Sequence, residues 1–479
     1  MRPRLHNLIF VFMALGVVVG LLLARVEDKG SDGFLLTIQW LDFFGKTVFI
    51  GLLKMIIAPL ILASIVAGVT SIPSFQDAGR IGFRTLGYYV GTTTVAVAIG
   101  LALVLIIQPG NRGAAESMRE QRSAELEQRR AQFEQETGKS AEDDRAQYLT
   151  WLEVLEGEGA SDKYTRVVAK RNRSTFDMFV DDIVKPMIDN PFHALTTRNS
   201  LGIITFALLL ALACASIGAP ARPVVDFFQA MNKVILKITN WLMAISPFAI
   251  FCLMASIIAT HGPEVFETLG WYCGTVIGGI FIHIAFLLTL CMIVGRMNPL
   301  RFFNGIREAW AVAFATRSSA ATLPVTVRCV TQKLGVSPKV ANFTLPVGAT
   351  VNMDGTALYE GVAVIFLIQI YGGMDDVGIT LAGGAILIIF ITAVLASVGA
   401  AAVPDAGLVT MVLVATAVHL PVYYLPFIFA VDAFLDMFRT STNVMGDAVG
   451  AVVVDRFENG GAPPEPPELP PTEAPTAEA

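Results

Sequence analysis

Long apolar segments recur in the chain near residues 8–24, 46–72, 83–108, 200–218, 235–259 and 271–295. Each has at least the roughly 17 residues that a transmembrane helix needs to cross a bilayer. Inside hydrocarbon every backbone polar group needs a partner within the chain, so each segment is expected to be helical. With 54% hydrophobic and 15% charged residues, the chain is too apolar for a soluble globular protein. The sequence therefore predicts an all-α polytopic membrane protein.

Positive charges between the segments predict the orientation. If each segment crosses once, one side of the membrane carries Arg2, Arg4, Arg80, Arg84, Arg222, Lys233, Arg296, Arg301 and Arg307. Cytoplasmic loops are enriched in such residues, so the N-terminus is expected in the cytoplasm and residues 110–195 outside. The segment 8–24 is long enough to span, and no A-x-A site follows it, which favours a first transmembrane helix over a signal peptide.

Polar stretches suggest the domain boundaries. The stretch "SMREQRSAELEQRRAQFEQETG" favours a solvated helix, and the Pro- and Glu-rich end "GGAPPEPPELPPTEAPTAEA" favours disorder. We expect three transmembrane helices in 1–109, an extracytoplasmic insertion in 110–195, further helices in 196–262, a core in 263–455 and a disordered cytoplasmic tail in 456–479.

Other residue types argue against several functions. A net charge of −6 without a basic cluster argues against a nucleic-acid partner. The cysteines lie singly in apolar stretches, which favours small core residues; they are Cys214, Cys252, Cys273, Cys291 and Cys329. The histidines have no metal-binding spacing; they are His6, His193, His261, His283 and His419. No cofactor is predicted.

From residue 302 onward the apolar pattern is interrupted. Segments 302–333, 338–370, 378–418 and 422–454 contain polar and small residues within hydrophobic runs, as in "ATRSSAATLP", "GATVNMDGT" and "ASVGAAAVPDAGLVT". Irregular backbone survives at membrane depth only where protein buries it or where it lines a cavity. Interrupted segments in corresponding positions point to a transporter's binding site. The order hairpin, helix, hairpin, helix suggests an internal repeat around such a site.

The segment 431–454 carries four charges, each of which costs about 2.5–3.5 kcal/mol at the centre of a membrane helix. At about 100° per residue, one stripe about 80° wide holds Asp432, Asp436, Arg439, Asn443 and Asp447. An internal ion pair between Asp436 and Arg439 is one alternative, but it leaves Asn443 and Asp447 unexplained. An arginine fork matches a carboxylate and a carboxylate suits an ammonium. The stripe therefore predicts a site for a zwitterionic acidic ligand and a metal cation.

A further carboxylate, Asp354 in "NMDGT", has no basic neighbour in the sequence. With Asp447 it leaves uncompensated negative charge in a site of low dielectric constant. Hard cations take oxygen ligands, which exposed carbonyls of an unwound helix can supply, so sodium is the expected counter-charge. The hydroxyls and carbonyls of Tyr89, Thr92 and Thr93 could add ligands, with core packing as the alternative.

At these residues the sequence resembles the glutamate transporter family, the dicarboxylate/amino acid:cation symporters that include the excitatory amino acid transporters. The resemblance covers roughly 40–108 and 200–455, through "YYVGTTT", "TRSSAATLP", "LPVGATVNMDGTALYEG", "ASVGAAAVPDAGLVTM" and "DAFLDMFRTSTNVMGD" in family order and spacing. It implies eight transmembrane helices plus two re-entrant helical hairpins, assembled as a homotrimer in the lipid of the plasma (cell inner) membrane. It also implies an elevator mechanism, in which a scaffold surrounds a mobile transport core that includes the third helix.

The resemblance implies a binding site for L-glutamate or L-aspartate. Arg439 would bind the side-chain carboxylate of the substrate and Asp436 its amino group. The same shell would contain Arg317, Ser318, Ser319, Thr356, Val403, Gly407, Thr440 and Asn443. The tip of the second hairpin, from Ala402 to Gly407, would be the extracellular gate.

The resemblance also implies three sodium sites. One combines the Asp447 carboxylate with carbonyls of Gly348, Asn352 and Asn443. A second, under the gate, uses carbonyls of Thr350, Ser397, Val398 and Ala400. The third contains Asp354, Asn352, Tyr89, Thr92 and Thr93.

Three features depart from the family pattern. Arg317 lies in the first hairpin, and Met437 follows Asp436, as in archaeal members; animal members place that arginine after the aspartate of the last helix. The gate tip reads Ala-Ala where glycine is usual, and the polar insertion has no recognised match.

Glu360 lies six residues beyond Asp354 in an otherwise apolar half-helix. Archaeal sodium-only members resemble this chain elsewhere but carry glutamine here, whereas proton-coupled animal members carry glutamate. A carboxyl group removed from water takes up a proton more readily. Glu360 is therefore the candidate for proton coupling, with a purely structural glutamate as the alternative and potassium counter-transport left open.

The sequence thus predicts a sodium-coupled symporter of acidic amino acids and not an enzyme. The near alternatives are a C4-dicarboxylate or a neutral amino acid:sodium symporter of the same family. Asp436 argues against a dicarboxylate because it would meet no ammonium. More distant alternatives are an anion channel activity and an intramembrane hydrolase using Ser318 or Ser319, for which no G-x-S-x-G motif or base is visible.

Overall fold

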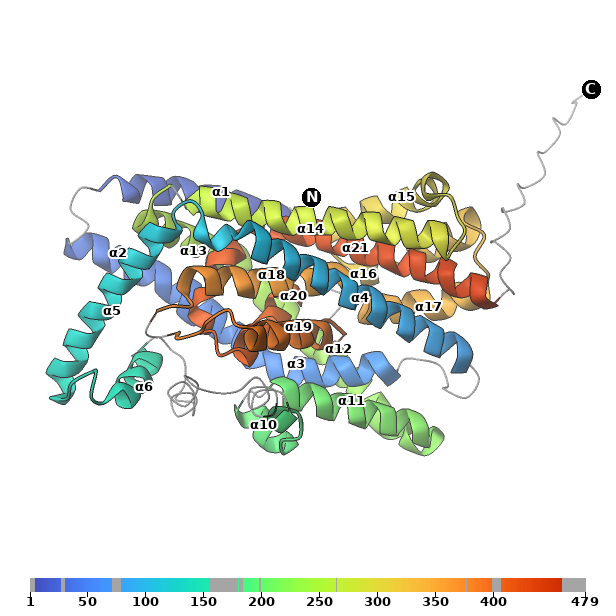
Figure 1. Ribbon diagram of the computed structural model, residues 1–479, viewed down its shortest axis with the longest axis horizontal. Coiled ribbons are helices and arrows are strands. Elements are labelled where there is room, and N and C mark those ends of the chain that lie inside the picture. The colour runs from blue at the N-terminus through green and yellow to red at the C-terminus, as the bar shows by residue number, and fades with distance from the viewer. Residues whose placement is uncertain are drawn as a thin grey trace, which may run out of the picture.

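The computed structural model describes residues 5–26, 31–70, 79–155, 180, 184–197, 200–263, 265–374, 377–398 and 406–458. In these residues the chain is almost entirely helical and contains no strand, which confirms the predicted all-α class. The longest helices run along the long axis of the bundle (Figure 1). They are α4 (Gly79–Ile107), α14 (Val265–Ile293) and α21 (Pro426–Glu458).

One group of helices comes from the first half of the chain. Helix α1 (Leu5–Ala24) packs along α13 (Ser246–His261), and α3 (Gly51–Thr70) packs on α11 (Ser200–Ile217) and α12 (Arg222–Ala244). The first pair lies very close, because a Cβ on Gly20 would come within 2.7 Å of the Ile258 Cβ. Such close approach at small residues drives helix association where lipid removes the hydrophobic driving force. Shorter helices complete this part: α2 (Asp32–Asp42), α9 (Lys185–Met187) and α10 (Pro191–Thr197).

A second group surrounds α21. Helices α15 (Pro299–Thr316) and α16 (Ser319–Arg328) form one pair, and α19 (Gly383–Val398) and α20 (Ala406–Ala417) form another. Between them in the sequence, α17 (Pro338–Val351) and α18 (Asp354–Tyr371) are two halves of an interrupted helix. Helices α4 and α14 pack against α18 and α21. The predicted order of hairpin, helix, hairpin, helix is the order that the structure shows.

Three stretches of described helix are long and apolar enough to cross a membrane: Ile81–Asn111, Val265–Ile293 and Pro338–Tyr371. The third stretch contains the interruption. In its apolar 18-residue part, 94% of the residues are buried within the protein. Burial of this kind is what an interrupted helix at membrane depth requires. Shorter apolar helices cover Val11–Ala24, Thr205–Ile217, Pro247–Thr260 and Gly383–Ser397. Large apolar side chains such as Phe83, Ile106 and Leu209 point outward, as expected beside lipid.

The polar insertion contains α5 (Ala115–Thr137) and α6 (Arg145–Leu155), which lie at the end of the bundle opposite the C-terminal end of α21 (Figure 1). The predicted helix is present, but it is not solvated on all sides. The Arg119 guanidinium donates to the carbonyls of Gln369 and Ile370, at 2.8 and 3.0 Å, at the end of α18. Met118 is fully buried. Periodic charges alone could not show that one arginine of this helix caps the carbonyl end of another.

Candidate functional site

The polar stripe predicted on 431–454 lies on α21 and is enclosed by the other helices. Its members Asp432, Asp436, Arg439, Asn443 and Asp447 expose at most 5% of their surface. They share a face because α21 is continuous, so residues three, four or seven positions apart line up. Burying so many polar groups is costly unless each finds a partner, and the neighbouring helices supply most of these partners.

Arg439 is at the centre of a buried charge cluster. Its Nη1 donates to Asp432 Oδ1 at 2.8 Å, and its Nη2 lies 3.0 Å from Asp436 Oδ1. The guanidinium carbon lies 4.0 Å from the centre of the Tyr359 ring, a cation–π distance. A Cβ on Gly407 would come within 2.9 Å of Nη1. The guanidinium therefore fills the space that a side chain at this glycine would need.

Arg439 also has hydrogen-bond capacity left over. Within the described residues, its Nε and Nη2 make no hydrogen bond, although the side chain is fully buried. An arginine has five N–H donors arranged to meet carboxylates, so these donors suit an anionic ligand. The Asp436–Arg439 ion pair considered from the sequence is thus present, but it does not use all the hydrogen-bond donors of the guanidinium.

The first hairpin brings a second cation to this cluster. Arg317 ends α15 in the left-handed conformation, with φ 53°, and its Nη1 lies 3.7 Å from Asp436 Oδ2. Ser318 caps α16, its hydroxyl accepting from the Ala321 N–H at 3.2 Å. Arg317, Ser318 and Ser319 expose 7% or less of their surface. From α21 itself, the Thr440 hydroxyl donates to Asp436 at 3.4 Å.

The interruption between α17 and α18 is fixed by Asn443. The Asn443 Oδ1 accepts from the Gly355 N–H at 2.8 Å, and its Nδ2 donates to the Thr356 hydroxyl at 3.3 Å. Gly355 lies against the α21 backbone, where a Cβ would come within 2.7 Å of the Arg439 carbonyl oxygen. The beginning of α18 is therefore held directly against the charge cluster.

Four residues of the first predicted sodium site meet around Asp447. The Asn352 Nδ2 donates to Asp447 Oδ1 at 2.9 Å and to the Asn443 carbonyl at 3.2 Å. A Cβ on Gly348 would come within 2.5 Å of Asp447 Oδ1, so the α17 backbone lies against the carboxylate. No basic side chain in the described part of the chain forms an ion pair with Asp447. The structure thus brings together a buried carboxylate and the residues whose carbonyls were predicted beside it.

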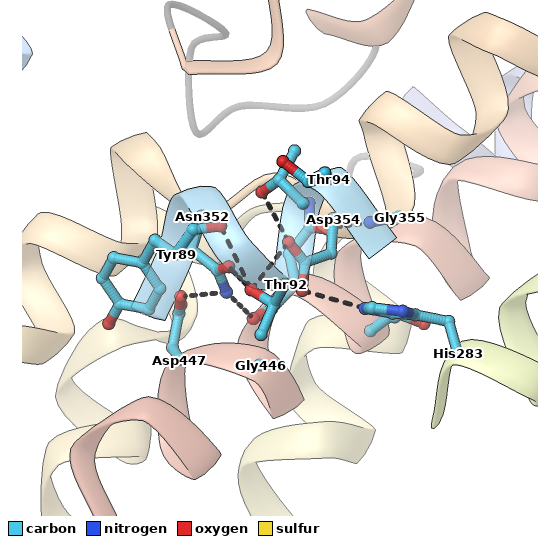
Figure 2. Close-up of polar contacts among 12 residues, drawn as sticks. Tyr89, Thr92, Thr94, His283, Asn352, Asp354, Gly355, Gly446 and Asp447 are labelled. Carbon is cyan, nitrogen blue, oxygen red and sulfur yellow. Dashed lines mark hydrogen bonds and ion pairs between the residues drawn. The ribbon is translucent and has the colours of Figure 1, made fainter. Parts of the chain in front are cut away.

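Asp354 forms a neighbouring centre (Figure 2). Its Oδ1 accepts from the hydroxyls of Thr93 at 2.7 Å and Thr92 at 3.3 Å, and its Oδ2 lies 2.9 Å from His283 Nε2. The Thr92 hydroxyl also lies 3.4 Å from Asn352 Oδ1, so it links this centre to the one at Asp447. In Figure 2, Asp447 and Tyr89 lie to one side of Asp354 and His283 to the other.

Other predicted site residues have contacts of their own or lie outside the described residues. The Tyr89 hydroxyl donates to the Thr344 carbonyl at 2.9 Å and makes no hydrogen bond to Asp354. The hydroxyls of Thr350 and Ser397 each bond to a carbonyl of their own helix. Val398 is the last residue of α19. The predicted ligand Ala400, the substrate contact Val403 and most of the gate tip lie outside the described residues.

Glu360 is fully buried on α18 and accepts a hydrogen bond from the Thr410 hydroxyl of α20. Its second carboxyl oxygen makes no hydrogen bond within the described residues. Thr410 in turn lies 3.4 Å from the Gly407 carbonyl, and Gly407 lies against Arg439. Glu360 is thus connected to the charge cluster through α20.

Sequence reasoning missed two residues of the site. His283 was counted among scattered histidines, and Tyr359 had no assigned contact. The only signal for His283 is a polar ring in the apolar helix "FIHIAF". Tyr359 lies five residues beyond Asp354, on the half-helix that the sequence had already placed at the site.

Comparisons with known proteins cover all of these elements. Residues 5–457 match the model of the "Sodium:dicarboxylate symporter family". The chain is 38% identical to excitatory amino acid transporter 2 of Homo sapiens over 461 residues, 94% of this chain and 78% of that protein. It is 37% identical to an excitatory amino acid transporter of Caenorhabditis elegans, over 93% of this chain and 86% of that protein. It is 38% identical to excitatory amino acid transporter 3 of Mus musculus, over 95% of this chain and 86% of that protein.

These matches confirm the family resemblance stated from the motifs. They span the helices that carry Arg439, the interrupted helix and the two carboxylate centres, so the likeness extends well beyond a short motif. The chain belongs to the sodium:dicarboxylate symporter family, a family of membrane transporters and not of enzymes.

Proposed function

We propose that the protein is a sodium-coupled symporter of the acidic amino acids L-glutamate and L-aspartate. The observation that carries this proposal is the buried Arg439 guanidinium: it is paired with Asp436, and among the described residues its Nε makes no hydrogen bond. An acidic amino acid has a side-chain carboxylate for the first and an ammonium for the second. A substrate would therefore replace the contacts that Arg439 and Asp436 now make with each other. The Ser318–Ser319 hairpin, buried beside them, would complete the shell.

The two carboxylate centres support coupling to sodium. Asp447 and Asp354 are buried. The hydroxyls of Thr92 and Thr93 contact Asp354, and the Asn352 side chain contacts Asp447. Asn443 connects the two functions: its carbonyl contacts Asn352 in the cation centre, and its side chain holds Gly355 and Thr356 in the substrate shell. Binding at one centre would set the geometry of the other, which is the physical content of coupling.

The names of the relatives favour amino acids as the substrate class. Several similar proteins are named excitatory amino acid transporters. The family name leaves a C4-dicarboxylate as the near alternative. Asp436 favours the amino acid, because a dicarboxylate would bring a second negative group to this carboxylate and no ammonium. The proposal includes residues 402–407 as the extracellular gate. It also includes a second sodium site formed by carbonyls under that gate, as the family resemblance implies.

We further infer a plasma-membrane homotrimer whose subunits have eight transmembrane helices and two re-entrant hairpins. The apolar helices support the spans. The insertion and the end of α21 lie at opposite ends of the bundle (Figure 1), which supports an outer insertion and a cytoplasmic C-terminus. The cytoplasmic N-terminus rests on the positive charges between the spans. In an elevator mechanism, the helices around α21 would move against the group that contains α1, α3 and α11–α13. Helix α5 would move with the former, since Arg119 is bonded to the end of α18.

Substrate-driven sodium entry tests the function directly. Purified protein in proteoliposomes should take up radioactive sodium when L-aspartate or L-glutamate is added outside, and much less with succinate or L-leucine. A channel would pass sodium without substrate, and a hydrolase would move none. Sodium uptake driven by succinate alone would replace the proposal with the dicarboxylate alternative.

Proton coupling is proposed through Glu360. Glu360 is buried and bonded to Thr410 of α20. Thr410 contacts the Gly407 carbonyl, and Gly407 lies against Arg439. A proton carried on Glu360 could therefore affect α20, the helix that follows the predicted gate. Uptake should be faster with an inward proton gradient, because protons load from the acidic side. Glu360→Gln should remove this dependence and keep sodium-dependent exchange. Identical pH-gradient responses of wild type and Glu360→Gln would make the glutamate structural and leave sodium as the coupled ion.

A further inference from the structure

His283 is a buried polar residue to which the proposed function gives no role. It lies on α14, which packs against α4 and α18, and its Nε2 is 2.9 Å from Asp354 Oδ2. Both side chains are completely buried. The imidazole is stacked against Phe286, with ring centres 5.7 Å apart, so its orientation is fixed by packing as well as by the hydrogen bond.

The hydrogen-bond pattern shows which ring nitrogen carries the hydrogen. A carboxylate only accepts hydrogen bonds, so Nε2 is the donor. In the described part of the chain, His283 Nδ1 makes no hydrogen bond. A hydrogen on Nδ1 would therefore be a buried donor without an acceptor, which is costly. The ring is best satisfied as the single tautomer that donates to Asp354.

The two oxygens of Asp354 have hydrogen-bond donors that differ in whether they can turn away to admit a cation. Thr93 donates to Oδ1, and the Thr92 hydroxyl lies 3.3 Å from it with the Tyr89 carbonyl and Asn352 Oδ1 as further acceptors. A hydroxyl can rotate its hydrogen away and present a lone pair to a cation. The Nε2–H of a packed imidazole cannot turn in this way. Oδ2 therefore stays bonded to the histidine, while Oδ1 is the oxygen that can exchange hydroxyl donors for a cation.

We propose that His283 is a positioning residue for sodium: it holds Asp354 Oδ2 so that Oδ1 faces Thr92 and Thr93 as the cation ligand. This inference rests on the proposed sodium-coupled function and assigns the histidine no cation contact of its own. Partners that orient a ligating group commonly change metal affinity about 10- to 100-fold when they are removed.

The test measures sodium binding through its effect on L-aspartate binding in purified, full-length protein. His283→Ala should raise the sodium concentration for half-maximal aspartate binding about tenfold or more, while saturating sodium restores wild-type aspartate affinity. His283→Gln, whose amide can donate to the same oxygen, should recover most of the loss. Replacing choline by sodium should raise the melting temperature, and His283→Ala should need a higher sodium concentration than wild type for the same increase. Wild-type sodium dependence in His283→Ala, or a Gln variant as impaired as Ala, would overturn the inference.

Two further measurements separate this role from general packing. His193→Ala removes an exposed His–Asp contact of the same length, 2.9 Å between Nδ1 and Asp189 Oδ2, and should leave sodium dependence unchanged. In a double-variant cycle, His283→Ala should cost less when Asp354 is already Asn, because the carboxylate that the histidine positions is then absent; equal costs in the two backgrounds would overturn the inference. If wild-type aspartate binding ignores sodium, the proposed function itself falls; sodium dependence that is the same in all variants removes only the role of His283.

Discussion

Arg439→Cys is expected to weaken the binding of L-aspartate and L-glutamate severely, up to the loss of measurable binding. The substrate carboxylate would lose a charge-assisted, two-pronged partner in a buried site, and truncating such a pair costs about 2–5 kcal/mol. Because about 1.4 kcal/mol corresponds to a tenfold change in affinity, the dissociation constant should rise by about 30-fold to several thousandfold. The smaller, neutral side chain also leaves room near Gly407 and Tyr359, so small neutral amino acids should bind better than to wild type. Isothermal titration calorimetry in saturating sodium measures both effects.

The variant needs a control for folding, because Asp432 and Asp436 would lose their shared cation. Arg439→Cys combined with Asp432→Asn removes the charge left without a cation, since Asp436 still lies 3.7 Å from Arg317 Nη1, and should show the same change in selectivity. Arg456→Cys is the matched control on the same helix: Arg456 is buried and bonds to the Val294 carbonyl, far along α21 from the cluster. It should leave aspartate affinity unchanged. Unchanged aspartate affinity in Arg439→Cys would remove the basis of the substrate assignment.

Asp447→Asn and Asp354→Asn are expected to weaken aspartate binding strongly at low sodium while the protein stays folded. Asparagine keeps the shape of the side chain but not the negative charge that a buried cation requires. Coupling between two sites commonly amounts to about 1–3 kcal/mol, or about 5- to 150-fold in affinity, and the loss should fall in this range. At high sodium the loss should shrink if the remaining oxygens still bind the cation. Aspartate titrations over a series of sodium concentrations, with choline as replacement, measure the effect.

Asp455→Asn provides the matched control on α21. Asp455 is also buried, but it accepts from the N–H and hydroxyl of Ser337, away from both cation centres. Its neutralisation should not alter the sodium dependence of aspartate binding. If wild type binds aspartate equally well in sodium and in choline, sodium coupling is refuted. If Asp455→Asn shifts the sodium dependence as much as Asp447→Asn does, the two centres lose their special role.

Much of the candidate site could be read from local sequence. The spacing of Asp432, Asp436 and Arg439 placed them on one face of one helix, because side-chain direction along a helix follows a fixed period. The polar residues in "NMDGT" marked the interruption between α17 and α18, because polar residues within an apolar membrane segment indicate a helix break or a binding site. The small residues after Arg317 likewise marked the tip of the first hairpin. These are properties of each segment by itself.

The tertiary structure decided which of these segments face one another. His283 and Asp354 are 71 positions apart, and nothing in either helix alone indicates that they meet. The Tyr89 hydroxyl bonds to Thr344 on α17 and not to Asp354, although its neighbours Thr92 and Thr93 reach that carboxylate. Arg119 is fixed to α18 although the charges around it favour a solvated helix. Periodicity determines the face that a residue occupies on its own helix; the partner across that face depends on how helices cross and how side-chain volumes fill the space between them.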